Sequence, residues 1–432
     1  NLLLRAILLQ CWPLMAGTDK YRLIGQCRLC DSSNLEPYCD FGDVPLGNNL
    51  ADSRDDALLA DRYPLSVNRC VACDHFQLAV AVAPEKLYAT NYTYLSGVGK
   101  SFVLHFQEYA AWVQDRCNFQ SDALVVDVGS NDGTCLKEFK NLGFKVCGVD
   151  PASAPAQLAN EAGIHTLNLF FDEAAVDEII TTHGKADFIT SHNVLAHVDD
   201  LGAVFRNIHR LLKTGGHLCF EIGYFSQVLK NGCFDTIYHE HLDYHHAKPL
   251  AQFLCGIGFD LVDLSVNQVQ GGSLRLFLQK SGDGMISSGA KQFLDEEARS
   301  ILYQGDALSA WPSRIKENMM KFGETVKAHV AAGKTVVGYG APTKATLLME
   351  MSELGPSDIC FMVEDNVLKV NKFMPGTGVP ILDVAELQVR KPDIIVIFAW
   401  NFCDDIIAKL KVQVDWPATF LVPLPDFMEV NW

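Results

Sequence analysis

Two Cys-x-x-Cys pairs near the beginning of the chain set the strongest limit on its fold. Cys27 and Cys30 form one pair, and Cys70 and Cys73 form the other. Four thiolates make the closed tetrahedral shell that Zn²⁺ takes at structural sites, which leaves no position for a reacting water molecule. The alternative is four unrelated buried cysteines. We expect a small zinc-binding domain over residues 25–82, in which the metal stabilises the fold and has no catalytic role.

The size and composition of the chain indicate a folded protein of several domains. Its 432 residues are enough for about two to four domains, and 49% of them are hydrophobic. The formal net charge of −17 would repel the backbone of a nucleic acid, so we expect no such partner.

No stretch reaches the roughly 20 consecutive apolar residues that span a bilayer. Fourteen cysteines scattered through an acidic chain are typical of reduced thiols, so we predict a cytoplasmic protein.

The first residues are apolar but lack the other features of a signal peptide. No basic region precedes the apolar run, no clear small-residue cleavage site follows it, and Met15 lies shortly before the first domain. We interpret the apolar run as a translation extension, and we expect residues 1–24 to be an N-terminal extension that precedes the first domain.

The middle of the chain has the pattern of an α/β domain. An apolar strand over residues 123–128 ends in a turn that contains Gly129 and Gly133, and a second strand follows at 144–150 after a helix. Strand, helix and strand in this order favour a parallel βαβ unit. A dinucleotide fingerprint beginning at Gly129 would need glycines where Asn131 and Thr134 stand, so this turn does not fit NAD.

A cluster of titratable side chains, residues 238–246, follows the expected fifth strand of this sheet. It contains four histidines, two carboxylates and two phenols. General acid and base chemistry is the favoured interpretation, because imidazole titrates near neutrality. The alternatives are a catalytic metal site, although the spacing H-E-x-x-H is absent, and a purely structural cluster. His197, which follows the fourth strand, should reach the same edge of the sheet.

The C-terminal part predicts a second, smaller α/β layer. A helical segment over residues 295–332 should break at Trp311 and Pro312. Strands are expected at 334–340, 359–365 and 394–400. The turn after the first of these strands has Thr343 where the third glycine of a dinucleotide fingerprint would stand. This weakens the hypothesis that the turn binds NAD. Lys344, at the start of a helix, could contact a phosphate or could simply be a surface lysine.

Several of these motifs, taken in order, resemble one family. They are the two cysteine pairs with the loop Asp-Phe-Gly-Asp-Val-Pro-Leu-Gly at 40–47, Tyr-Thr-Tyr-Leu-Ser at 92–96, Asn-Val-Leu-Ala-His-Val at 193–198, Tyr-His-Glu-His at 238–241, and Gly-Tyr-Gly-Ala-Pro-Thr-Lys at 338–344. From about residue 26 onward the chain resembles the sugar C-methyltransferases of deoxysugar biosynthesis. The resemblance implies methyl transfer from S-adenosylmethionine to C3 of a nucleotide-linked 4-keto-deoxysugar, usually carried on dTDP.

The resemblance also implies an architecture: an α/β protein with a Rossmann-like S-adenosylmethionine methyltransferase domain, a small N-terminal zinc-binding domain and a C-terminal Rossmann-like domain. The predicted parts are an extension at 1–24, the zinc-binding domain at 25–82, a helical linker at 83–120, the methyltransferase domain at 121–285, a helical connector at 286–332 and the C-terminal domain at 333–432. Within the linker, the periodicity of residues 102–116 predicts an amphipathic helix.

Site residues follow from the resemblance by matching positions. His241 matches the base that removes the C3 proton, with Glu240 and Tyr238 as partners, and Tyr92 and His197 match two further active-site residues. The expected donor-binding residues are Asp127, Gly129, Ser130, Asn131, Asp132, Gly133, Asp150, Pro151 and Asn193. The expected substrate-binding residues are Lys344, Thr343, Ser273 and Arg275.

Two positions depart from the family pattern. His192 stands where an asparagine is expected, and Gln270 stands where a histidine is frequent. Both bear on the substrate more than on the reaction. Two other classes of function stay open from the sequence: an NAD-dependent oxidoreductase with two Rossmann-like layers, and a non-catalytic protein that binds zinc and a nucleotide. The oligomeric state, monomer or dimer, is not predicted.

Overall fold

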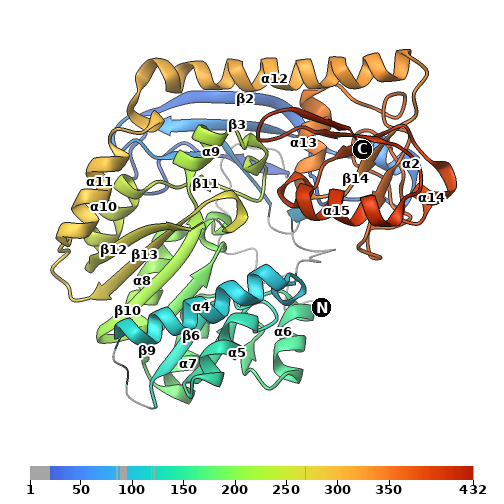
Figure 1. Ribbon diagram of the computed structural model, residues 1–432. Coiled ribbons are helices and arrows are strands. Elements are labelled where there is room, and N and C mark those ends of the chain that lie inside the picture. Colours follow the sequence, from blue (N-terminus) through green and yellow to red (C-terminus); the bar gives the residue numbers. More distant parts are fainter. Residues whose placement is uncertain are drawn as a thin grey trace.

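The structure is a computed structural model that describes residues 20–83, 86–87, 95–117, 119, 122–267 and 269–431. Most of the extension at 1–24 and the predicted active-site residue Tyr92 lie outside these residues. In Figure 1 the methyltransferase sheet lies below and the C-terminal domain lies to the right, while the long helix α12 (Gly305–Ala331) crosses above both. None of the helices in the described part of the chain combines the length and apolarity needed to cross a bilayer.

The largest sheet has seven strands in the order β12-β13-β10-β9-β6-β7-β8. Their bounds are β6 Leu124–Val128, β7 Lys145–Val149, β8 Thr166–Leu167, β9 Ala186–His192, β10 Leu212–Gly223, β12 Phe259–Asn267 and β13 Ser273–Lys280. The five strands from β10 to β8 are parallel, whereas β13 runs antiparallel to both of its neighbours. Every residue of β6 is buried, as expected for a parallel strand covered on both faces. The α/β fold with a Rossmann-like central domain is confirmed.

Helices cover both faces of this sheet. One face packs against α4 (Lys100–Cys117), α5 (Thr134–Asn141) and α6 (Ser153–Glu161). The other packs against α7 (Glu173–His183), α8 (Leu201–Leu211), α10 (Ala247–Ile257) and α11 (Ser288–Glu297). Helix α4 confirms the amphipathic helix predicted at 102–116, and its Phe106, Tyr109 and Val113 are buried against the sheet.

The N-terminal domain is built on a four-stranded antiparallel sheet in the order β11-β4-β3-β2. Its strands are β2 Leu35–Pro45, β3 Arg62–Cys70, β4 Phe76–Leu78 and β11 Asp243–Tyr244, and a separate pair joins β1 Tyr21–Leu23 to β5 Val80–Val82. Strand β11 comes from the histidine cluster that follows β10, so the predicted domain at 25–82 does not contain its whole sheet. The cluster is thereby attached to the zinc-binding domain.

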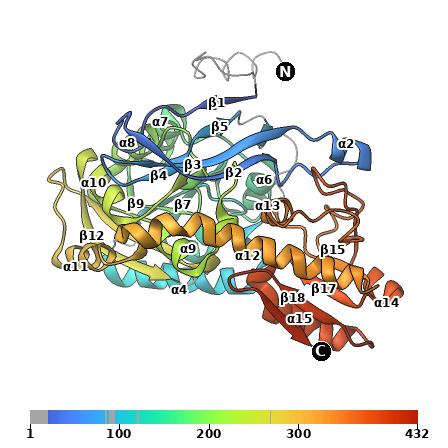
Figure 2. The ribbon, with the colours of Figure 1, turned by 90° about the horizontal axis from the view of Figure 1, so that it is seen from above.

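The C-terminal domain holds a six-stranded sheet in the order β16-β15-β14-β17-β18-β19, in which only β19 is antiparallel. The strands are β14 Val336–Tyr339, β15 Met362–Glu364, β16 Ile381–Asp383, β17 Ile394–Ile397, β18 Thr419–Val422 and β19 Met428–Asn431, with helices α13 Thr343–Met351, α14 Glu386–Arg390 and α15 Cys403–Gln413. Figure 2 shows α12 lying across the molecule toward this domain. One hydrophobic core joins α12 to the N-terminal and C-terminal sheets.

The predicted helix break at Trp311 and Pro312 is wrong. Helix α12 runs without interruption past Pro312. The proline forgoes one helical hydrogen bond, but Trp311 is 1% exposed and its Nε1–H donates to the carbonyl of Leu229 at 3.0 Å. Tertiary packing of Trp311 against the end of α9 (Phe225–Asn231) therefore outweighs the local preference.

Candidate active site

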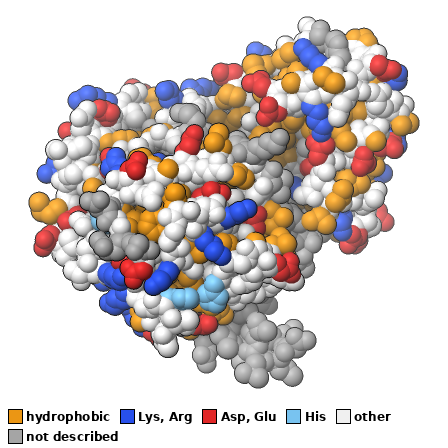
Figure 3. Space-filling view, turned by 60° about the horizontal axis from the view of Figure 1, so that its bottom comes forward, with side chains coloured by type: hydrophobic (Ala, Val, Ile, Leu, Met, Phe, Trp, Pro, Cys, Tyr) orange, Lys and Arg blue, Asp and Glu red, His pale blue; other side chains and the backbone are white. Residues whose placement is uncertain are grey.

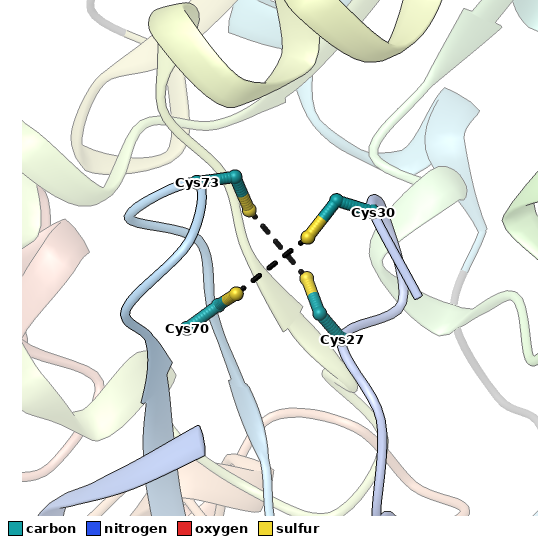
Figure 4. A group of neighbouring side chains, drawn as sticks. All are labelled: Cys27, Cys30, Cys70 and Cys73. Atoms are coloured by element: carbon teal, nitrogen blue, oxygen red, sulfur yellow. Dashed lines mark hydrogen bonds between the residues drawn. The ribbon is translucent and has the colours of Figure 1, made fainter. Parts of the chain in front are cut away.

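The four cysteines of the two pairs converge on one point. Figure 4 shows their sulfur atoms directed toward one another from two loops. The Sγ atoms of Cys27 and Cys73 lie 3.6 Å apart, as do those of Cys30 and Cys70, and all four lie within 4.8 Å of one another. Zn–S bonds of about 2.3 Å in a tetrahedron place the sulfurs about 3.8 Å apart. The set therefore fits a structural zinc ion with a complete thiolate shell.

The turn after β6 has the backbone that a close approach to a ligand requires. Gly129 and Gly133 have φ angles of +76°, where a side chain is strained. A Cβ on Gly129 would lie 2.3 Å from a methyl group of Val194. The side chains of Asn131 and Asp132 accept hydrogen bonds from the backbone N–H groups of Ser96 and Gly97, at 3.0 and 2.8 Å. The segment that precedes α4 is thus attached to this turn.

Carboxylates at the ends of β6 and β7 meet at the same turn. The two oxygens of Asp150 each accept a backbone N–H at 2.8 Å, one from Asn131 and one from Ala152. Burial raises the pKa of Asp150, and burial together with Asp150 raises the pKa of Asp127 well above its usual range. Oδ1 of Asp127 and Oγ of Ser130 are buried and have no hydrogen-bond partner among the described residues. Buried polar atoms without partners fit a site completed by a polar ligand.

The residues predicted to bind the methyl donor therefore gather around one turn. Asp127, Ser130 and Asp150 are buried there, whereas Pro151 is exposed beside them. Asn193 comes from the end of β9; its φ is +55°, and its backbone N–H donates to the carbonyl of Glu221 at 2.8 Å. These groups fit S-adenosylmethionine, because a carboxylate at the end of the second strand can accept hydrogen bonds from ribose hydroxyls and the glycines leave room for the backbone to approach the ligand.

His241 is held on both ring nitrogens. Nδ1 lies 2.8 Å from the carbonyl oxygen of Thr236, and Nε2 lies 2.8 Å from the hydroxyl of Tyr238. A carbonyl can only accept, so Nδ1 carries the hydrogen and Nε2 accepts from Tyr238. Burial and the neighbouring His197 lower the pKa of His241 well below its usual range. The ring is therefore neutral, with its basic nitrogen at Nε2.

Two other predicted catalytic residues lie beside His241. The rings of His197 and His241 are 4.7 Å apart and nearly perpendicular, and burial lowers the pKa of His197 to about 4. The side chain of Glu240 bonds to the N-terminal domain: its Oε1 accepts a hydrogen bond from Nδ2 of Asn48 at 2.7 Å. Burial raises the pKa of Glu240 to about 7.

Asn48 links the cluster to the C-terminal domain. Its Oδ1 accepts a hydrogen bond from the hydroxyl of Thr343, at the start of α13. Gly47 makes this contact sterically feasible, because a Cβ there would lie 2.2 Å from the carbonyl oxygen of Thr343. The glycine that ends the loop at 40–47 therefore has a physical role, and the sequence signal for Asn48 was its place directly after that motif.

A cleft joins the predicted donor, base and substrate residues. Asn193, His241, Ser273 and Lys344 all line it. Further lining residues come from several elements: Ala196, Ile222, Gly223, Phe225, Val228, Cys233, Thr236, Asp243, Tyr244, Gly271, Gly272, Trp400 and Asn401. Of the residues predicted to hold the methyl donor, Asn193 thus lines the same cavity as His241, Ser273 and Lys344, whereas the residues of the turn after β6 do not line it.

Lys344 is fixed by groups that the sequence did not single out. Its ammonium lies 2.9 Å from Oδ1 of Asn401, 3.5 Å from Oδ2 of Asp235 and 4.8 Å from the centre of the Trp400 ring. Asp235 is fully buried and also accepts from Nε1 of Trp400 at 2.5 Å. No local motif marks Asp235 or Trp400, since their association depends on the packing of η6 (Trp400–Phe402) against η3 (Phe234–Thr236).

Arg275 and His192 belong to a different network and do not line the cleft. Oε1 of Glu221 accepts from Nε of Arg275 at 2.6 Å, and Oε2 lies 3.1 Å from Nδ1 of His192 and 2.7 Å from Nε2 of His105. Glu221 is 1% exposed, so these bonds satisfy a buried carboxylate. Arg275 is thus held by Glu221, and its contact with substrate stays a prediction.

On the face drawn in Figure 3, basic side chains lie singly or in small groups among acidic ones. Side chains of both charges therefore lie close together on this face.

Comparison with known proteins gives matches along almost the whole chain. A family model described as the C-methyltransferase C-terminal domain matches residues 268–425, a methyltransferase domain matches 104–264 and a zinc binding domain matches 27–88. The C-methyltransferase NovU of Streptomyces niveus is 32% identical over 409 residues, which cover 94% of this chain and 97% of that protein. A ubiquinone biosynthesis O-methyltransferase of Serratia proteamaculans (strain 568) is 32% identical over 115 residues, 26% of this chain and 46% of its own length.

Two solved methyltransferase structures resemble part of the molecule. A magnesium protoporphyrin IX methyltransferase from Synechocystis PCC 6803 covers 41% of this chain and 79% of its own, with 14% identity and a TM-score of 0.33. An S-adenosylmethionine-dependent methyltransferase from Clostridium acetobutylicum ATCC 824 covers 42% and 92%, with 13% identity and a TM-score of 0.35. Neither likeness bears on substrate or mechanism.

The family matches agree with the two ligand sites described above. The methyltransferase model covers the turn at Gly129, and the zinc binding model covers all four cysteines. The cofactors are S-adenosylmethionine and zinc, as predicted. Because NovU matches this chain over nearly the full length of both proteins, the chain belongs to the C-methyltransferase family that its motifs resemble.

Proposed function

We propose that the protein transfers a methyl group from S-adenosylmethionine to C3 of a nucleotide-linked 4-keto-deoxysugar, with dTDP as the expected nucleotide. The single observation that carries the proposal is the position of His241: a neutral imidazole lines the same cleft as Asn193 and Lys344. A base at this place is needed when the methyl acceptor is a carbon that must first lose a proton. The carbon next to a ketone is such an acceptor.

In the proposed first step, Nε2 of His241 takes the proton from C3, and the electron pair of the C–H bond forms the enolate. Tyr238, whose hydroxyl donates to Nε2 in the structure, turns its O–H to the enolate oxygen. Lys344, which lines the same cleft, adds a positive charge. The low pKa of His241 makes it a weak base, which the negative charge of the enolate offsets by stabilising the imidazolium.

The bound S-adenosylmethionine supplies an electrophilic methyl group. The enolate carbon attacks this group in line, a carbon–carbon bond forms, the methyl–sulfur bond breaks and the ketone is restored. The chain's own part in this step is to hold the two reactants in the correct positions. His241 then releases its proton to solvent, which completes the balance of charge.

The proposal places the nucleotide against the C-terminal domain. Thr343 and Lys344 begin α13. The hydroxyl of Thr343 donates to Asn48, which donates to Glu240 of the histidine cluster, and the ammonium of Lys344 lies 3.5 Å from Asp235. A helix start with a lysine favours a phosphate. We further place the protein in the cytoplasm, since the cysteines in the described residues outside the zinc site are free thiols.

Incubation of the pure protein with methyl-labelled S-adenosylmethionine and a panel of dTDP-4-ketosugars tests the proposal. We expect label at C3 of at least one sugar, and His241→Asn should bind the donor normally but lose transfer by roughly 100-fold or more. Full activity of His241→Asn, or label on oxygen or nitrogen only, would contradict it. A titration with NAD in the same preparation tests the oxidoreductase alternative.

A further inference from the structure

One arginine of the first zinc knuckle reaches both loops that carry His197 and His241. Arg28 lies between the first two cysteines, and its Nε–H is 3.0 Å from each carboxylate oxygen of Asp243. One terminal nitrogen is 3.2 Å from Oδ1 of Asp199, and the other donates to the carbonyl oxygen of Val198. A single guanidinium therefore joins two segments that are more than forty residues apart in sequence.

These contacts are immediately adjacent to the proposed catalytic residues. Val198 directly follows His197, and Asp243 lies two residues after His241. The two loops also share a backbone bond, from the N–H of Leu242 to the carbonyl of Ala196 at 2.7 Å. The separation of 4.7 Å between the rings of His197 and His241 thus depends on loops that Arg28 holds together.

The connection is buried and charged. The side chain of Arg28 is 6% exposed and that of Asp243 is fully buried. Oδ1 of Asp243 also lies 2.8 Å from Nε2 of His75, two residues after the last cysteine of the second knuckle. Both knuckles therefore contact one carboxylate. A buried pair that satisfies its hydrogen bonds contributes little net stability, but it enforces one geometry, and loss of one partner is costly.

We propose that Arg28 is a positioning residue for methyl transfer, which fixes His197 and His241 relative to each other by attaching their loops to the zinc site. The zinc ion would then act on the reaction through this guanidinium, without touching a substrate. The inference rests on the proposed function, since it assigns both histidines to the cleft chemistry. It differs from a role in folding alone, because it requires the ring geometry to change when Arg28 is replaced.

Arg28→Gln and Arg28→Lys test the proposal against Arg69→Gln as a matched control. Arg69 also adjoins a zinc-ligand cysteine and forms an ion pair, but its partner is Asp74. For each variant we would measure the zinc content, the affinity for S-adenosylmethionine, kcat and KM, and the ring nitrogen resonances of His197 and His241. The last measurement needs no sugar substrate, so it reports on Arg28 even if the proposed acceptor is wrong.

We expect Arg28→Gln to retain one zinc ion and normal donor affinity, to lose kcat by roughly 100-fold with little change in KM, and to shift both histidine resonances. Arg28→Lys, which keeps the charge but not the fork of donors, should fold and recover part of kcat. Arg69→Gln should resemble the wild type. Unchanged kcat and resonances in Arg28→Gln, or an equal loss in Arg69→Gln, would overturn the proposal. If Arg28→Gln does not fold, Arg28→Lys decides the question: unshifted resonances of His197 and His241 together with full kcat in that variant would overturn the proposal.

Discussion

The hydroxyl of Tyr238 donates a hydrogen bond to Nε2 of His241 across 2.8 Å, and the two rings are 4.1 Å apart. The Tyr238 hydroxyl therefore occupies Nε2, the nitrogen that must accept the proton of the substrate. A hydrogen bond to the neutral imidazole favours the neutral form. It acts in the same direction as burial and the neighbouring His197, which lower the pKa of His241. Tyr238 thus restrains the base and, once its hydroxyl has turned, can donate a hydrogen bond to the enolate oxygen.

Tyr238→Phe separates these two effects. We expect kcat to fall by roughly 10- to 100-fold, because an enolate donor is lost, while the pKa of His241 rises because its hydrogen-bond donor is lost. The acid limb of the kcat profile should therefore move to higher pH. Tyr303→Phe is the control, since its hydroxyl lies 3.4 Å from Nδ1 of His246, outside the cleft. An unchanged acid limb in Tyr238→Phe would show that the hydroxyl does not act on His241.

Glu240 predicts a dependence of stability on pH. Its pKa is raised from the ordinary 4.5 to about 7 by burial, so the folded state holds a proton that the unfolded state releases. The contribution of this bound proton to the free energy of unfolding is fully present below about pH 4.5 and is lost as the pH rises through about 7. Glu240→Gln keeps the acceptor for Asn48 and removes the buried charge. Its free energy of unfolding should match the wild type near pH 5 and exceed it near pH 8.5, by on the order of 1–3 kcal/mol.

Thermal unfolding of both proteins at several pH values checks this prediction. The difference between them should grow across neutrality. Two curves that stay parallel from acid to alkaline pH would mean that Glu240 titrates normally in the folded protein.

The sequence was sufficient for features that depend on local pattern. The cysteine spacing predicted a set of four thiolates, and the glycine turn after a buried strand predicted the donor site, because these features lie within short segments. It was also sufficient to place His241 after the fifth strand. Local pattern failed at Pro312, where burial of the neighbouring Trp311 maintains the helix.

Contacts between distant segments could not be predicted. Strand β11 has two residues and no alternation to read, yet it completes the N-terminal sheet by pairing with β4. Asp243 could be seen as a carboxylate in a cluster, but its pairing with Arg28 across the sequence arises only from that sheet. The ion pair of Arg275 with Glu221 likewise arises only from the antiparallel pairing of β13 with β10.

Removal of zinc should unfold more than the N-terminal loops. Three of the four cysteines, Cys27, Cys70 and Cys73, are part of the same hydrophobic cluster as the methyltransferase sheet. Strand β11, which follows His241, pairs with β4 of the N-terminal sheet. We expect chelation, or Cys30→Ser, to lower the melting temperature by roughly 10 °C or more and to abolish methyl transfer. Cys360→Ser is the control, because Cys360 is an exposed thiol outside the cluster. Metal analysis with thermal unfolding checks the result, and a zinc-free protein of unchanged stability would contradict it.

Gly129 should be indispensable for donor binding. In Gly129→Ala the new Cβ would lie 2.3 Å from a methyl group of Val194, and the residue would have to keep a φ angle of +76°. Gly143→Ala is a matched control, since its φ is +94° but a Cβ there would meet nothing within 4 Å. Both variants bear backbone strain, and only the first forces the donor turn away from the loop that begins at Asn193. Calorimetric titration with S-adenosylmethionine should therefore show a Kd raised by roughly 10-fold or more in Gly129→Ala and a nearly normal Kd in Gly143→Ala. Equal affinities in the two variants would mean that the turn can move without cost, and that the close approach of Gly129 to Val194 does not shape the donor site.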